Sequence, residues 1–200
     1  MSPQTESGAS RDIRELRSSI DSLDGAFMFI LSERMRTVSR IMRLKKKYRV
    51  PPDKSAERDD DIKRTCRLAK KLGLSGSLIS EILQRIYLES KISSHCDDFN
   101  GGAVPEDGGL RAGLKDFRTT LLSLDSAFCY LLAERFRLVM RIGEHKERNS
   151  IPAFSEDRWK EVLATRIERA RMLGISTGLV SDILEMIHLE ALTIEEGIIR

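Results

Sequence analysis

The chain has few cysteines, few histidines and no long apolar run. Its three cysteines are odd in number and lack metal-ligand spacing, which argues against a disulfide framework or a cysteine metal site. Cys66, Cys96 and Cys129 are therefore interpreted as buried free thiols. The three histidines are scattered along the chain, and none has a second histidine at a ligating spacing. We expect neither a metal nor another cofactor.

No stretch approaches the roughly 20 consecutive apolar residues that span a bilayer. The first ten residues, MSPQTESGAS, lack the basic and apolar regions of a secretory signal. We therefore expect a cytoplasmic protein without a membrane partner. Alternation with period two is also absent over any strand-length segment, which predicts an all-α fold.

One pattern occurs twice in the chain, 101 residues apart. The segment from Ile13 to Lys47 and the segment that starts at Leu114 share Ser-Leu-Asp, Ala-Phe and Glu-Arg. Farther on, LGLSGSLISEILQRIYLES matches LGISTGLVSDILEMIHLEA at the same offset. We predict two copies, residues 11–96 and 111–197, joined by a linker at 97–110 that is rich in Gly, Asp and Pro.

Each copy is expected to form three helices. Apolar residues recur every three or four positions from Ile13 to Met42, which indicates a long amphipathic helix that ends before Pro51. Shorter helices should follow, with Gly73 and Gly174 as C-caps. The expected ranges are about 55–72 and 75–95 in the first copy, and about 112–148, 155–173 and 176–196 in the second.

The length of the first helix predicts how the copies pack. At 1.5 Å per residue, about 35 residues span about 50 Å, which one short helix pair cannot cover. The two long helices should therefore pack on each other and make one chain a pseudo-dimer. Two chains could also exchange copies to form a homodimer.

Charge is divided unevenly between the copies. Residues 11–96 carry 20 Lys+Arg against 12 Asp+Glu, whereas residues 97–200 carry 14 against 18, so the copies attract each other. Nucleic acid is not expected as a partner, because Tyr48 alone places an aromatic ring among the clustered cations. Those cations are interpreted as a solvated helix face: Arg40, Arg43, Lys46, Lys47 and Arg49.

Three cations recur in both copies at the same phase. Arg34 and Lys45 lie eleven residues apart, three helical turns plus about 20°, so they share one face about 16 Å apart and can converge on a small anion. Arg17 lies about 25 Å from Arg34 and about 100° round the helix, so it can serve only the pocket of the other copy. The second copy repeats the set as Arg118, Arg135 and Lys146. This pattern favours a dianionic ligand held by several cations.

These residues resemble the all-helical AroQ class of chorismate mutases. The signature Leu-Arg-x-x-Ile-x-x-Leu-Asp, then Glu-Arg, then a Lys eleven residues later reads Leu16 to Asp24, Glu33-Arg34 and Lys45. The second copy reads Phe117 to Asp125, Glu134-Arg135 and Lys146. The resemblance covers nearly all of both copies. It implies two three-helix units intertwined as a pseudo-dimer, with chorismate as substrate and prephenate as product.

The resemblance also implies two composite sites. In each, a crossing arginine and the Glu-Arg arginine would hold two carboxylates, the lysine would donate to the ether oxygen, and a loop arginine would support a carboxylate. Site one would consist of Arg17, Arg135, Lys146, Arg158 and Glu195. Site two would consist of Arg118, Arg34, Lys45, Arg58, Asp59, Ser90 and Ser94.

Both sites depart from the family pattern. The family usually places a Glu that binds the ring hydroxyl after the loop arginine, but here Asp59 is shorter and Trp159 cannot accept a hydrogen bond. Late in the third helix the family has Ser, then Gln or Glu four residues on. The second copy has Ala191 and Glu195, and this carboxyl must be protonated to donate to the ether oxygen. The catalytic residues are predicted to be Lys146, Glu195 and Lys45.

Two other functions remain open at this point. One is an isochorismate-pyruvate lyase of the same fold, which can also lack the Glu after the loop arginine. The other is a catalytically decayed scaffold that binds an anion or a protein partner. Turnover of chorismate against turnover of isochorismate would distinguish them.

Overall fold

The structure is a computed structural model that describes residues 8–50, 55–93 and 108–199. Within these ranges the regular elements are all helices, which confirms the predicted all-α fold. They are α1 (Gly8–Tyr48), α2 (Ser55–Lys71), α3 (Gly76–Ser93), α4 (Gly108–Arg148), α5 (Glu156–Leu173) and α6 (Thr177–Ile198). The predicted bounds agree to within a few residues, and α4 begins inside the segment predicted as a linker. Ser94, His95 and Cys96 lie outside the described residues.

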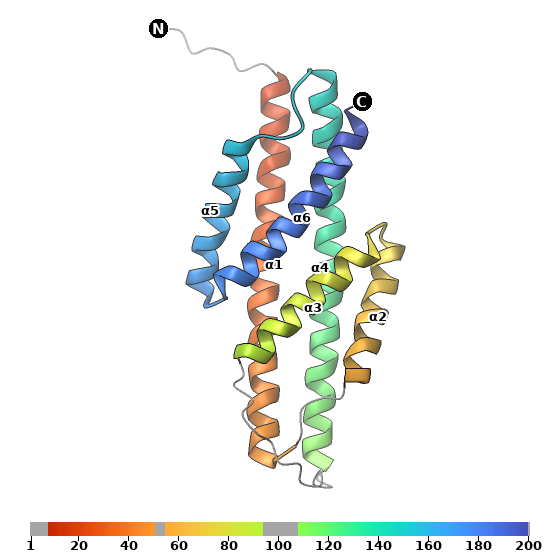
Figure 1. Ribbon diagram of the computed structural model, residues 1–200, viewed down its shortest axis with the longest axis vertical. Helices are drawn as coiled ribbons and strands as arrows, with labels where there is room; N and C mark the ends of the chain where they lie inside the picture. Colours follow the sequence, from red (N-terminus) through yellow and green to blue (C-terminus); the bar gives the residue numbers. More distant parts are fainter. Residues whose placement is uncertain (1–7, 51–54, 94–107, 200) are drawn as a thin grey trace.

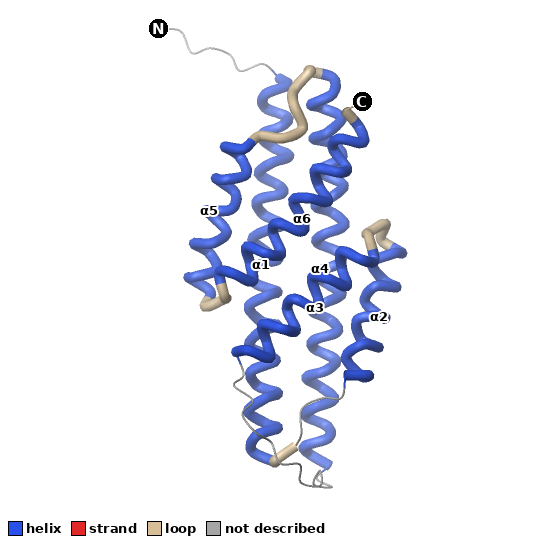
Figure 2. The backbone as a smooth tube through the Cα atoms, viewed as in Figure 1, coloured by secondary structure: helices blue, strands red, loops and turns tan. Residues whose placement is uncertain are grey.

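The long helices α1 and α4 lie side by side and run in opposite directions (Figure 1). Helices α3 and α6 lie across one face of this pair (Figure 2). Helix α5 packs on α1 and helix α2 packs on α4. Each of these two shorter helices therefore contacts the long helix of the other copy, and the copies are intertwined within one chain.

The core lies where the two long helices meet the crossing helices. Phe27 and Phe128, which are equivalent in the two copies, place their rings 4.8 Å apart between α1 and α4. Met28 and Ile183 are fully buried, and burial of each such side chain stabilises the fold by about 1.5–3 kcal/mol. Cys129 is also buried, and burial raises its pKa to about 12. It is therefore an inert thiol, as predicted.

The first cysteine of the chain differs from that prediction. Cys66, on α2, is only partly buried. Its thiol donates to the carbonyl of Gly76 at 3.5 Å. Both Cys66 and Cys129 are free.

Both long helices end in the same way. Arg49 and Ser150 take left-handed φ values of 54° and 53°. The next residue then donates its N–H at 2.9 Å to the carbonyl of Lys45 or of Lys146. This closure fixes the last helical turn, on which both predicted lysines lie. At the ends of α2 and α5, Gly73 and Gly174 take φ values of 79° and 67°, which confirms both predicted caps.

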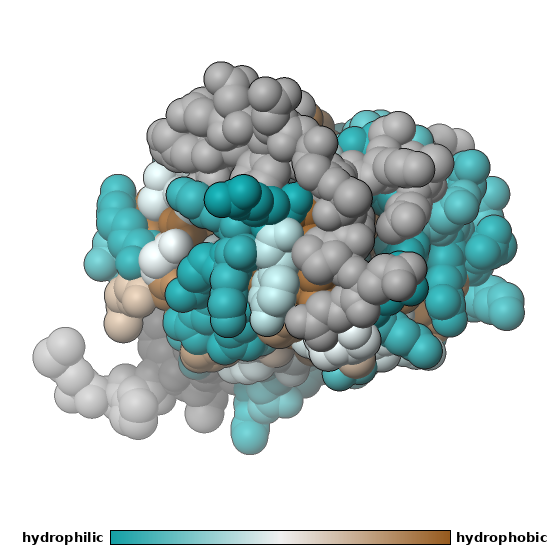
Figure 3. Space-filling view, turned by 90° about the horizontal axis from the view of Figure 1, so that it is seen from below, coloured by the Kyte–Doolittle hydropathy of each residue, from teal (hydrophilic) through white to brown (hydrophobic). Residues whose placement is uncertain are grey.

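The described part of one end of the molecule is largely polar (Figure 3). Seen from below, hydrophilic side chains dominate the described part of the end formed by α1 and α4 (Figure 3). No described helix combines the length and the apolar character needed to cross a membrane. The cations predicted to form a solvated face are all exposed: Arg40, Arg43, Lys46, Lys47 and Arg49.

Candidate functional site

Reciprocal ion pairs join the two copies at the centre of the long helices. Nε of Arg135 donates to Asp24 at 2.9 Å, and Nε of Arg34 donates to Asp125 at 2.6 Å. Both aspartates are buried. Because α1 and α4 are antiparallel, the arginine of each Glu-Arg motif meets the motif aspartate of the other copy. Arg34 and Arg135 therefore stand at the boundary between copies.

Lys146 and Glu195 form a buried pair in the second copy. Nζ of Lys146, near the end of α4, donates to Oε2 of Glu195 on α6 and to the carbonyl of Ala153. Both side chains are buried. An ammonium has three N–H donors, so Lys146 keeps one more for a ligand.

Cations from both copies act on the Glu195 carboxyl. Burial raises the pKa of Glu195, and this outweighs the lowering by Lys146, Arg17 and Arg135. Arg17 belongs to α1 of the first copy, whereas the other two belong to α4 of the second. The structure therefore brings Arg17 into the electrostatic surroundings of the second copy's lysine and carboxyl.

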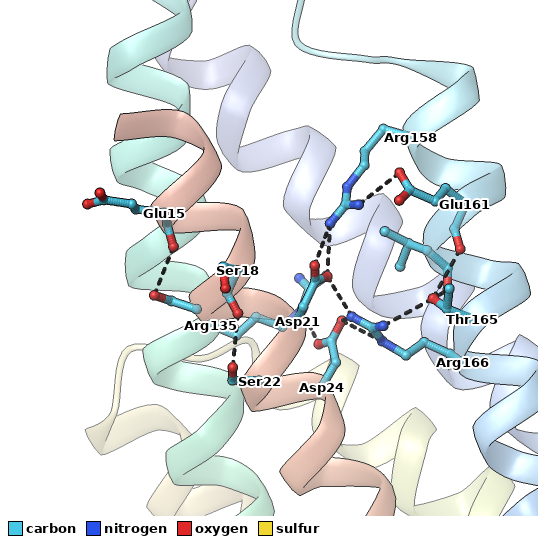
Figure 4. A network of polar contacts seen from close by, with 12 residues as sticks. Glu15, Ser18, Asp21, Ser22, Asp24, Arg135, Arg158, Glu161, Thr165 and Arg166 are labelled. Atoms are coloured by element: carbon cyan, nitrogen blue, oxygen red, sulfur yellow. Dashed lines mark hydrogen bonds and ion pairs between the residues drawn. The ribbon is translucent and has the colours of Figure 1, made fainter. Parts of the chain in front are cut away.

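Arg158 lies at the start of α5, beside α1. Its Nη2 donates to both carboxylate oxygens of Asp21 at 2.8 and 3.0 Å, and its Nη1 donates to Glu161 at 2.9 Å (Figure 4). A pocket of about 360 Å³ opens here between the two helices. Its lining comes from both copies: Ile13, Arg14, Arg17, Ser18, Asp21, Arg158 and Glu161.

Two of these cations have donors to spare. Nη1 of Arg135 is a buried donor without a hydrogen-bond partner in the described part of the chain. Among the same residues, the Arg17 side chain makes no hydrogen bond or ion pair. Buried donors are normally satisfied, so an anion with more than one carboxylate would complete this arrangement. The site can hold such an anion and stabilise charge that builds on it.

A fourth arginine, Arg166, was not among the predicted site residues. It is buried on α5 and donates to Asp21 at 2.7 Å and to Asp24 at 3.1 and 3.3 Å. Figure 4 shows Arg158 and Arg166 converging on these two aspartates. One signal could have found it: Arg166 lies three residues after Leu163 and four before Ala170, in the apolar phase of α5.

Site two is assembled differently. Arg118 crosses from α4 to α2, but Asp61 holds it through two hydrogen bonds of 3.0 Å each. Lys45 is buried, as Lys146 is. Ser90 donates to the carbonyl of Ile86 at 2.8 Å. Ser94, the other predicted member from α3, lies outside the described residues.

Arg58 holds the place of Trp159, not that of Arg158. Its guanidinium lies 4.5 Å from the ring centroid of Tyr87, while Trp159 stacks on His188 with centroids 4.0 Å apart and ring planes at 7°. Arg58 and Tyr87 stand 101 residues before Trp159 and His188, so the two pairs occupy equivalent positions in the two copies.

The offset also explains why the spacing from the lysine to the loop arginine differs between the copies. Glu57 stands 101 residues before Arg158, so the first copy has no arginine at that position. Arg58 instead donates to the neighbouring Asp59 at 2.8 and 3.0 Å. Site two therefore lacks a counterpart of Arg158, and its Asp59 carboxylate is already engaged.

Comparisons with known proteins agree with this duplication. Residues 16–93 and 117–196 each match the family model for chorismate mutase type II. The T-protein of Enterobacter agglomerans is 36% identical over 84 residues, which are 42% of this chain and 22% of that protein. The T-protein of Haemophilus influenzae is 35% identical over 71 residues, 36% of this chain and 19% of that protein.

The chain thus spans about a fifth of the length of these relatives. No solved structure matches it significantly. The two matched regions together cover most of the 200 residues, and the chain belongs to the chorismate mutase type II family.

Proposed function

We propose that the chain converts chorismate to prephenate and that site one performs the reaction. One observation carries this proposal: cations from both copies, Arg17 on one side and Arg135 and Lys146 on the other, act on the buried Glu195 carboxyl. A cationic cluster that retains unused donors suits a ligand with two carboxylates, which chorismate is.

The arginines would bind the substrate. Arg17 and Arg158 line the open pocket between α1 and α5, so they are suited to hold the more exposed carboxylate. The unpartnered Nη1 of Arg135 is suited to the more deeply buried one. Each charge-assisted bond also fixes orientation, because a guanidinium presents its donors in one plane.

The reaction itself requires no base or nucleophile. A carbon–oxygen bond of the ether breaks while a carbon–carbon bond forms at the far end of the enolpyruvyl group, and no proton leaves the substrate. The site must hold the folded, chair-like conformer and stabilise negative charge on the ether oxygen. The remaining N–H of Lys146 and the O–H of a protonated Glu195 are donors suited to that oxygen.

Site two is expected to contribute little. Arg118 is held by Asp61, Arg58 is paired with Asp59, and the first copy lacks a counterpart of Arg158. Arg158 of site one is also paired, with Asp21 and Glu161, but Nη1 of Arg135 is a buried donor that stays without a partner in the described part of the chain.

The proposal is tested with the purified full chain, chorismate and isochorismate in separate assays. We expect chorismate to be consumed with formation of prephenate at a rate far above the uncatalysed one. Release of pyruvate and salicylate from isochorismate alone would replace this function by the lyase activity, for which Trp159 beside Arg158 would then be the relevant difference. Conversion of neither would leave an anion-binding scaffold.

A further inference from the structure

His188 lies on the same face of α6 as Glu195. The two residues are seven positions apart, which corresponds to about two helical turns and about 10 Å along the axis. The charges of Arg135 and Lys146, both on α4, act on the imidazole. His188 is therefore an additional polar group of site one, which lies on the side of α6 that faces α4.

Aromatic neighbours fix the plane of this imidazole. It stacks on Trp159 of α5, with ring centroids 4.0 Å apart and planes at 7°. Phe154, in the segment before α5, lies 5.8 Å away at 45°. Neither imidazole nitrogen has a hydrogen-bond partner among the described residues. A half-buried polar ring held rigidly beside an anion site, with its polar atoms unused, is suited to a ligand.

The buried carboxylates described in site one already accept hydrogen bonds from cations, and the acceptors that remain, Ser18 and Glu161, line its open outer pocket. Asp21 and Asp24 are occupied by arginines, and Glu195 is occupied by Lys146. Trp159 offers only an N–H donor. The cations of the site can only donate as well: Arg17, Arg135, Lys146 and Arg158.

The electrostatic surroundings keep the imidazole neutral near pH 7. Burial lowers the pKa of His188, Glu185 on the same helix raises it, and Arg135 and Lys146 lower it further. The net shift is downward from an ordinary value of 6.5. A neutral imidazole has one nitrogen with a free lone pair, which accepts a hydrogen bond.

We propose that His188 accepts the hydrogen bond of the substrate's ring hydroxyl in site one and thereby determines specificity for a hydroxylated ring. This inference rests on the proposed function, because it requires chorismate to bind there. The proposal also gives the stacking of Trp159 on His188 a role. A carboxylate at position 159 would itself accept the hydrogen bond of the hydroxyl, whereas the indole of Trp159 holds the imidazole that accepts it.

The test compares two substrates and two matched variants of the full chain. The substrates are chorismate and the analogue that carries hydrogen in place of the ring hydroxyl. His188→Phe keeps a ring to stack on Trp159 but removes the acceptor. Tyr87→Phe alters the equivalent position of the first copy and is the control. Thermal unfolding of each variant reports whether the fold is intact.

We expect His188→Phe to lower kcat/KM for chorismate by about 10- to 100-fold, because the hydroxyl loses its partner in a desolvated site. For the analogue, kcat/KM should stay within about 2-fold of the wild-type value. His188→Asn, which keeps an acceptor oxygen, should lose less than His188→Phe does. Tyr87→Phe should change neither substrate's kinetics.

Two results would overturn the inference while leaving the proposed function in place. Equal losses of kcat/KM for chorismate and for the analogue would mean that His188 only supports the packing around Trp159. An unchanged kcat/KM for chorismate in a folded His188→Phe variant would mean that the imidazole does not contact the hydroxyl. A wild-type chain that leaves chorismate unchanged would instead overturn the proposed function, and the role of His188 with it.

Discussion

The Cα of Glu195 lies 3.6 Å from the point at which a Cβ on Gly143 would stand. The same Cβ would lie 3.0 Å from Cδ1 of Ile198, so the last turns of α6 pack directly on the backbone of α4. Gly143 is one turn before Lys146, and this close approach is what lets Glu195 reach the lysine. In the first copy the equivalent residue is Met42.

Gly143→Met should therefore impair catalysis more than folding. The larger side chain must push α6 outward, and overpacking of this kind costs about 1–3 kcal/mol of unfolding free energy. A displacement of about 1 Å at a positioned catalytic group can lower the rate by about 100-fold. We expect a loss of kcat of at least about 10-fold, measured with chorismate, alongside a modest fall in denaturant midpoint.

Gly197→Ala serves as the control for this change. It also adds a Cβ to α6, but nothing lies within 4 Å of that position. Alanine favours a helix over glycine by up to about 1 kcal/mol, so stability should rise slightly and kcat should not change. An equal loss of kcat in the two variants would mean that the packing of Gly143 against Glu195 has no special role.

Much of this architecture could be predicted from residue spacing. The three- and four-residue period gave the helices, the offset of 101 gave the duplication, and the Arg17–Arg34 separation required a crossing between copies. These features depend on backbone geometry, which is the same for any helix. The positions of Gly73 and Gly174 likewise follow from the left-handed conformation that a helix end favours for glycine.

The partners of individual charges could not be predicted in the same way. Arg58 matches the loop motif when residues are counted from the start of α2. The end of α2 keeps the offset of 101 from the end of α5, however, so Arg58 takes the place of Trp159. The phase of Arg166 on α5 indicates that it is buried, but only the packing of α5 on α1 reveals Asp21 and Asp24 beside it. Such contacts depend on tertiary packing between copies.

Activity should depend on Lys146 far more than on Lys45. Loss of a charge-stabilising donor in a closed site typically costs on the order of 100-fold or more, and we expect this for Lys146→Ala. Lys45→Ala should cost only a few-fold, because site two has its arginines engaged by Asp59 and Asp61. Arg141→Ala is the control in steady-state assays, because it removes an exposed arginine from α4, the helix that carries Lys146. Equal small losses at both lysines would favour the scaffold function.

Arg166→Leu should lower stability without leaving Asp21 or Asp24 unpaired. Asp21 keeps Arg158 and Asp24 keeps Arg135 when Arg166 is removed. The expected cost is about 1.5–3 kcal/mol, the range for a hydrogen bond to a charged group. Asp24→Ala leaves two arginines without this carboxylate and should cost about 3–5 kcal/mol.

Chemical denaturation of both variants checks this order. Arg169→Ala, which removes an exposed arginine from the same helix, should lie within about 0.5 kcal/mol of the wild type. If Arg166→Leu were as neutral as Arg169→Ala, the buried contacts of Arg166 with Asp21 and Asp24 would contribute nothing to folding.

The rate of site one should fall as pH rises through the pKa of Glu195. Burial raises this pKa above its ordinary value of 4.5 even though Lys146, Arg17 and Arg135 lower it. Below the pKa the carboxyl is protonated and can donate to the ether oxygen; above it the carboxylate can only accept. A pH–rate profile for kcat therefore should decline on its alkaline side, and Glu195→Gln, whose amide donates at every pH, should flatten it.

The same shift predicts a matching change in stability. A raised folded-state pKa means that the native chain binds this proton more tightly than the unfolded chain does. The contribution of Glu195 to the unfolding free energy should therefore fall as pH rises from the unfolded-state pKa to the raised one, and Glu195→Gln should remove that slope. A kcat that stays constant from about pH 5 to 8 in the wild type, together with a Glu195→Gln variant of unchanged rate, would remove Glu195 from the mechanism and leave Lys146 as the donor to the ether oxygen.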